Sequence, residues 1–185
     1  MDIKYFSQKD NEVPVDLQRS ICGLACVKMI VDFYHPEENQ SITDLIKEGN
    51  LIGAYDKKLE LWIHDGLVRI LRNHGISSYA QEFKSIEVDL ENKTYKKSQY
   101  SDELMQKGIE KIMRFVKRNK PVITSFKEGF GENTDSHLVL IKDYKTAKGN
   151  QNPIFIIHDP ISGPDIEVNL EHFLKYWRKF TIFVN

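Results

Sequence analysis

The chain has only two cysteines and no long apolar run in its 185 residues. Cys22 and Cys26 lie four positions apart, which on a helix places both thiols on one face, in a geometry that disulfides rarely adopt. A Cys-x-x-x-Cys spacing without a second cysteine pair is also a poor match for a zinc site. A metal site built from Cys22, Cys26 and nearby histidines is therefore a weak alternative, and we expect no metal and no cofactor.

The chain also lacks an excess of either charge, because its 26 Lys and Arg residues nearly balance its 27 Asp and Glu residues. This balance indicates neither nucleic acid nor an anionic membrane as a partner. The first residues lack the apolar segment of a signal peptide, and no run is long enough to cross a bilayer. With 41% hydrophobic residues, the sequence predicts an ordinary globular domain located in the cytoplasm. Its oligomeric state is not indicated.

The order of the expected elements is helices first and antiparallel strands afterwards, which predicts an α+β fold. Apolar periodicity predicts helices over residues 22–34, 42–49, 104–116 and 170–177, and a further helix marked by residues 59–71 and closed by Gly75. Ser41 and Asn169 are expected to cap the helices that follow them. Strand-like runs cover residues 122–126, 137–141, 154–157 and 180–184, and a short strand is expected at 3–6. Residues 79–100 are interpreted as a strand and a loop, and 127–136 as a loop that contains glycine.

Cys22 lies where the helix over residues 22–34 should begin. The first turn of a helix has unpaired N–H groups and the positive end of the helix dipole. Such surroundings favour the thiolate, which is the nucleophilic form of cysteine. A single cysteine in this position is more often a buried core residue, so the hypothesis of a nucleophile depends on partners elsewhere in the chain.

A nucleophilic cysteine needs a base and a third group that orients the base. His137 is the best candidate among the six histidines, because it begins an apolar strand directly after a loop. Asp159 ends the next strand, and antiparallel pairing can bring the two side chains together. His158 also lies at that strand end. The other four are interpreted as surface or helix-end residues: His35, His64, His74 and His172.

Residues 22–30, Cys-Gly-Leu-Ala-Cys-Val-Lys-Met-Ile, resemble the nucleophile motif of the C39-like cysteine peptidases, a papain-like group. Similar likenesses occur at residues 5–8, 120–123, 136–144, 154–160 and 171–177, so they span nearly the whole chain. The resemblance implies a single C39-like peptidase domain over residues 1–185. It also implies a papain-like fold, in which an N-terminal helical part with the nucleophile helix packs on a C-terminal antiparallel sheet.

By this resemblance, Cys22 is the nucleophile, His137 the base and later the acid, and Asp159 the residue that orients the histidine. The side-chain amide of Gln8 and the backbone N–H of Cys22 hold the oxyanion. Gln18 is an alternative to Gln8, because thirteen residues separate Gln8 from Cys22 and the family commonly shows a shorter gap. We favour Gln8, since its neighbours match the family and Gln18 leaves little chain in which to turn back.

Two classes of function follow. The first is a thiol hydrolase that cleaves a peptide or related amide bond through an acyl-enzyme, with a peptide or protein as substrate. A transferase, with an amine or thiol in place of water, uses the same residues. The second is a catalytically idle module that binds peptides in the same cleft, against which the retention of Cys22, His137 and Asp159 argues. The mixed charge of residues 79–100 and 127–136 suggests a polar substrate.

Overall fold

The computed structural model describes residues 1–84, 88–89, 91, 94–95, 101–127, 136–146 and 152–185. Its centre is a six-stranded antiparallel sheet with the strand order β3-β10-β6-β7-β8-β9. The strands are β3 (Ser78–Glu82), β6 (Val122–Lys127), β7 (Ser136–Thr146), β8 (Pro153–Asp159), β9 (Gly163–Asn169) and β10 (Trp177–Val184). Two short hairpins, β1 (Tyr55–Asp56) with β2 (Leu61–Trp62) and β4 (Val88–Asp89) with β5 (Thr94–Tyr95), lie outside this sheet.

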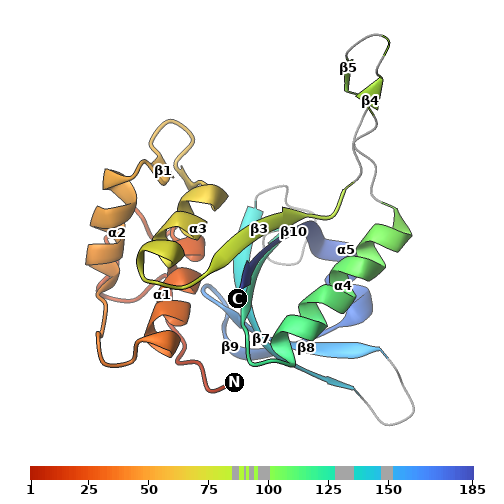
Figure 1. The fold of residues 1–185 in the computed structure, drawn as a ribbon. Coiled ribbons are helices and arrows are strands. Elements are labelled where there is room, and N and C mark those ends of the chain that lie inside the picture. The colour runs from red at the N-terminus through yellow and green to blue at the C-terminus, as the bar shows by residue number, and fades with distance from the viewer. Residues whose placement is uncertain (85–87, 90, 92–93, 96–100, 128–135, 147–151) are drawn as a thin grey trace.

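Helices cover both faces of the sheet (Figure 1). On one side lie α1 (Cys22–Tyr34), α2 (Ile42–Leu51) and α3 (His64–Asn73), of which α1 contacts β7 and α3 contacts β3. On the other side lie α4 (Asp102–Val116) and α5 (Leu170–Tyr176), with α4 against β6, β7 and β10 and α5 against β8 and β9. This arrangement confirms the predicted α+β class.

The sheet separates two hydrophobic cores. Along β7, Leu138 and Leu140 belong to the core beneath α1, whereas Val139 and Ile141 belong to the core beneath α4 and α5. This division follows from the alternation of side chains along a strand. Because both faces of β7 are covered over residues 138–141, these four residues form a continuous apolar run with no polar alternation. The strand that begins with the candidate base is therefore held between two packed layers.

The predicted strand at residues 3–6 is wrong. These residues belong to no strand, because the segment is attached through side chains in place of a backbone ladder. The Ile3 carbonyl oxygen accepts a hydrogen bond from Nε2 of His158 at 2.8 Å. The Tyr5 hydroxyl donates to the carbonyl oxygens of Asp159 and Pro160 at 3.1 and 3.2 Å. The N-terminal segment therefore lies against the end of β8.

The predicted helix over residues 59–71 is wrong at its start, since α3 begins only at His64, whereas its end at Asn73 agrees with the expected stop at Gly75. Before it, β1 and β2 form a hairpin in which Tyr55 pairs with Trp62. Trp62 is buried against Gly49, where a Cβ would lie 2.3 Å from the indole ring. The helix α2 also continues through Gly49 to Leu51, two residues further than predicted. Packing of Trp62 on α2 thus replaces the expected helical turn.

Strand β9 was not expected, and it pairs with β8 at the edge of the sheet. The helix caps were expected at two positions and are present. The Ser41 side chain accepts a hydrogen bond from the Asp44 N–H, and the Asn169 side chain accepts one from the His172 N–H. Within the part of the chain that the structure describes, no helix has the length and apolar character needed to cross a membrane.

Candidate active site

Cys22 is the first residue of α1 and is buried, with 9% of its surface exposed. Ile21 occupies the N-cap position and has no polar side-chain atom with which to cap the helix. The first turn also contains no acidic residue. The thiol therefore lies at the positive end of the helix dipole, without a carboxylate in that turn to oppose it.

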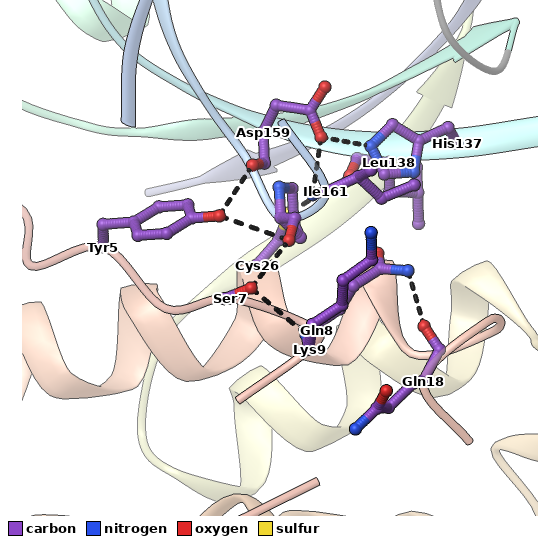
Figure 2. A network of polar contacts seen from close by, with 11 residues as sticks. Tyr5, Ser7, Gln8, Lys9, Gln18, Cys26, His137, Leu138, Asp159 and Ile161 are labelled. Atoms are coloured by element: carbon purple, nitrogen blue, oxygen red, sulfur yellow. Dashed lines mark hydrogen bonds and ion pairs between the residues drawn. The ribbon is translucent and has the colours of Figure 1, made fainter. Parts of the chain in front are cut away.

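His137 and Asp159 form a buried pair. Nε2 of His137 lies 2.6 Å from Oδ1 of Asp159, and the two residues are 4% and 3% exposed. The pair forms because β7 and β8 are antiparallel neighbours in which Leu140 faces His158. The beginning of β7 and the end of β8 therefore meet at one edge of the sheet, as the sequence predicted. Figure 2 shows the two side chains directed toward each other.

The protonation of His137 depends on both of its partners. Burial alone would lower the pKa of His137, but hydrogen bonds to Asp159 and Cys22 and the charges of these two residues raise it to about 10. Burial would raise the pKa of Asp159, but the hydrogen bond and charge of His137 and the Ile161 N–H lower it overall. The structure thus places Cys22 beside a buried His137–Asp159 pair in which an imidazolium and a carboxylate are both stabilised.

A set of hydrogen bonds from the N-terminal segment holds the turn that follows Asp159 (Figure 2). The Pro160 carbonyl oxygen accepts from the hydroxyls of Tyr5 and Ser7 at 3.2 and 3.3 Å and from the Gln8 N–H at 3.0 Å. Oδ1 of Asp159 also accepts from the Ile161 N–H at 2.9 Å. Sequence reasoning missed the contribution of Tyr5 and Ser7, because these contacts join residues more than 150 positions apart.

Gln8 and Gln18, the two candidates for the oxyanion position, contact each other. Nε2 of Gln8 donates to the Gln18 carbonyl oxygen at 2.6 Å, and Oε1 of Gln8 has no hydrogen-bond partner among the described residues. The Gln8 side chain is buried, and its backbone lies beside Pro160. The Gln18 amide donates instead to the carbonyl oxygen of Val13 at 3.3 Å. Of the two glutamines, Gln8 is the one whose backbone N–H contacts the turn that follows Asp159.

A cavity of about 1070 Å³ is lined by both Cys22 and His137. One wall consists of Asp16, Leu17, Arg19 and Ser20, and the β1–β2 hairpin with the residues up to His64 forms another. Leu59, Leu61 and Ile63 contribute exposed apolar side chains to that second wall. His64 begins α3, so it is a helix-end residue as predicted. Its ring also stacks on Phe180 with centroids 3.9 Å apart and lines the cavity, which was not expected. This contact joins α3 to β10, so no local pattern in the sequence could indicate it.

The second cysteine has different surroundings. Cys26 is fully buried one turn along α1, and its Sγ lies 3.5 Å from the Leu138 carbonyl oxygen. Burial first, then the charges of Cys22 and Asp159, raise the pKa of Cys26 well above its usual value. Cys22 and Cys26 are both free thiols. Among the described residues, no three histidine, cysteine or acidic side chains are grouped as a metal site would require.

An α+β fold with a thiol at a helix start and a His–Asp pair on the adjoining sheet is typical of the papain-like class of cysteine peptidases. The model of the Peptidase_C39 like family matches residues 1–182 of this chain, and the chain belongs to that family. The family assignment made from residues 22–30 is therefore confirmed.

Solved structures of C39 peptidases share the fold of this chain. A putative C39-like peptidase from Bacillus anthracis is 13% identical, with a TM-score of 0.59 over 100% of this chain and 95% of that one. A double glycine motif protease from an AMS/PCAT transporter, solved in complex with the leader peptide, is 13% identical, with a TM-score of 0.54 over 99% and 91%. The peptidase domain of Streptococcus mutans ComA is 15% identical, with a TM-score of 0.50 over 98% of each chain. No curated protein matches the chain.

Proposed function

We propose that this chain is a cysteine peptidase that cleaves a peptide or related amide bond through an acyl-enzyme. The observation that carries the proposal is the buried pair of His137 and Asp159, with Cys22 and His137 lining the same cavity. Membership of a peptidase family supports it, as does the leader peptide bound to one structural neighbour. We also propose that residues 1–185 form one domain, since both hydrophobic cores pack on the same sheet.

In the proposed mechanism, the Cys22 thiolate attacks the carbonyl carbon of the bound amide, and the C=O electron pair moves onto oxygen. The backbone N–H of Cys22 and a side-chain N–H of Gln8 stabilise that oxyanion. His137 then gives its proton to the leaving nitrogen, the C–N bond breaks, and a thioester remains on Cys22. A water molecule next loses a proton to His137 and attacks the thioester. The acid product leaves, and the thiolate and imidazolium are restored.

Asp159 acts through the histidine. Its carboxylate accepts the hydrogen bond from Nε2 of His137, which fixes the ring and stabilises the imidazolium. The Ile161 N–H binds the same carboxylate oxygen and thereby holds its orientation. The imidazolium next to Cys22 then carries the proton that the leaving nitrogen receives.

The proposal predicts that Cys22 reacts rapidly with iodoacetamide at pH 7 and that His137→Ala slows this reaction by about a hundredfold. The imidazolium that stabilises the thiolate is lost in that variant. Mass spectrometry of the alkylated chain measures the rate at each cysteine separately. Cys26 is the internal control, because it is fully buried and should remain unlabelled in both proteins.

An equally slow reaction in the wild type and in His137→Ala would contradict the proposal and favour an idle peptide-binding module. Cys22→Ser should abolish the fast labelling, and circular dichroism of each variant verifies that the fold is retained. Hydrolysis of a peptide library by the wild type, and none by Cys22→Ser, would then establish the reaction itself.

A further inference from the structure

A second cavity, of about 560 Å³, lies next to the one that contains Cys22. Its wall comes from the first residues of β10, the end of β6, and single residues of β3, α3 and α5. These are Trp177, Arg178, Lys179, Phe180, Ser125, Lys127, Glu82, His64 and Lys175. His64 lines both cavities, and its stacking on Phe180 forms the partition between them. A chain bound over Cys22 therefore has this second cavity beside it.

Positive charge dominates the second cavity. Four of its lining residues are cationic, and its one carboxylate, Glu82, pairs with Lys84 at 2.5 Å. The four cations are Lys127, Lys175, Arg178 and Lys179. Over the whole chain the net charge is only −1, so this clustering is a local feature. Such a concentration of one sign in a concave site attracts the opposite charge.

The backbone of β10 is irregular where it contributes residues to the second cavity. The register between β10 and β6 shifts between Trp177 and Thr181, which marks a bulge over residues 178–180. Lys179 has a φ of 61° at this bulge. Burial first, then repulsion from Lys127, lowers the pKa of Lys179, so the two ammonium groups lie close enough to repel each other. A bulge commonly re-aims side chains beside a functional site.

A buried hydroxyl completes the wall. Ser125 is 1% exposed, and its Oγ has no hydrogen-bond partner among the described residues. Buried polar groups are rarely left without a partner. Because Ser125 lines the cavity, a ligand oxygen there would accept its O–H while the surrounding cations neutralise the charge of that ligand. The set combines a directional donor with several cations, which suits a carboxylate.

We propose that the second cavity is a subsite for an acidic side chain of the peptide substrate, a few residues from the bond cleaved at Cys22. The proposal rests on the proposed peptidase function. Lys127 and Lys179 supply the charge, Ser125 supplies a neutral hydrogen bond, and His64 separates this subsite from the catalytic cavity.

The binding test uses the inactive Cys22→Ala protein, so that it does not depend on catalysis. The probe is N-acetylglutamate α-amide, with N-acetylglutamine α-amide and inorganic phosphate as comparisons, followed through the NMR shifts of the Ser125, Lys127 and Lys179 amides. Of the two amino-acid probes, we expect only the glutamate derivative to cause saturable shifts. Lys127→Gln combined with Lys179→Gln should weaken binding about tenfold. The matched control combines Lys117→Gln with Lys120→Gln, which removes two charges outside the cavity.

The absence of saturable shifts, or equal weakening by both lysine pairs, would overturn the subsite. Binding of phosphate without binding of the glutamate probe would overturn the assignment to a carboxylate. Cleavage of a randomised peptide library by the wild type should show Asp and Glu enriched at one position, and the Lys127/Lys179 variant should lose this enrichment while still cleaving neutral peptides. Cleavage without acidic preference would overturn the subsite alone, whereas probe binding without any cleavage would overturn the peptidase function.

Discussion

The amide nitrogen of the Gln8 side chain has a second hydrogen available for a hydrogen bond. Nε2 donates one hydrogen to the Gln18 carbonyl oxygen, and an amide nitrogen carries a second hydrogen. That second donor is the one we assign to the oxyanion. We therefore expect Gln8→Ala to lower kcat by about a hundredfold to a thousandfold, with the iodoacetamide reaction of Cys22 unchanged, because alkylation forms no oxyanion.

Gln18→Ala is the matched variant, because it removes the other glutamine side chain while leaving the backbone carbonyl that Gln8 contacts. It should change kcat by much less than Gln8→Ala does. A larger loss of kcat in Gln18→Ala would transfer the oxyanion role to Gln18. Thermal unfolding of both variants separates a loss of donor from a loss of fold, since Gln8 is also buried.

The residues with a local signal were the ones that the sequence could indicate. Cys22 begins a periodic apolar segment, and His137 and Asp159 lie at strand ends, so each could be chosen before the structure. Tyr5, Ser7 and His64 carry no such signal. Their positions depend on contacts with Pro160 and Phe180, which the chain reaches only after folding.

At the scale of elements, the contact between α2 and the β1–β2 hairpin sets one wall of the cavity. Gly49 lies inside α2, where alanine would normally gain up to about 1 kcal/mol in helix propensity. A Cβ at this position would lie 2.3 Å from the ring of Trp62, and a rigid indole cannot yield at its tip. We expect the cost of overpacking to exceed the gain in helix propensity, so that Gly49→Ala lowers the free energy of unfolding by about 1–3 kcal/mol in urea denaturation.

A double-mutant cycle isolates this clash. In a Trp62→Leu background the ring is gone, so Gly49→Ala should become neutral or slightly stabilising, with a coupling energy of about 1–3 kcal/mol. The same cost for Gly49→Ala in both backgrounds would show that the Trp62 ring is not what fixes the hairpin to α2.

Elements were predictable where apolar periodicity and capping agreed, as at the starts of α2 and α5. Strand β9 was missed because Gly163-Pro164-Asp165 resembles a turn and an edge strand needs few apolar residues. The hairpin was missed for the opposite reason. Leu59 and Trp62 fit a helical period, yet Leu59 is 66% exposed in the hairpin and Trp62 packs on α2.

At the scale of the whole molecule, two buried histidines of the central sheet, His137 and His158, have pKa values that shift in opposite directions. In His158, Nε2 donates to the Ile3 carbonyl oxygen and Nδ1 accepts from the Asp165 N–H. Only the neutral ring makes both bonds. Burial first, then the charge of Lys142, lowers the pKa of His158, whereas the partners of His137 raise its pKa to about 10 despite burial.

These pKa shifts predict that stability is greatest at an intermediate pH and declines along two limbs, one toward higher pH and one toward lower pH. The raised pKa of His137 contributes stability that is fully present below pH 6.5 and is lost as the pH rises toward 10. For His158, the unfolded chain takes up a proton more readily than the folded one, so stability falls as the pH drops below 6.5. Asp159, with a lowered pKa, adds a loss as the pH falls below 3.8.

Urea denaturation between pH 5 and pH 10 measures both limbs. The wild type should lose on the order of a few kcal/mol between pH 6.5 and 10 through His137, and His137→Gln should flatten that decline relative to the wild type. His158→Gln should instead flatten the decline below pH 6.5. The control His172→Gln changes an exposed histidine of α5 and should keep both limbs. A decline above pH 6.5 that persists unchanged in His137→Gln would contradict a buried imidazolium between Cys22 and Asp159, and with it the charge state from which the proposed mechanism starts.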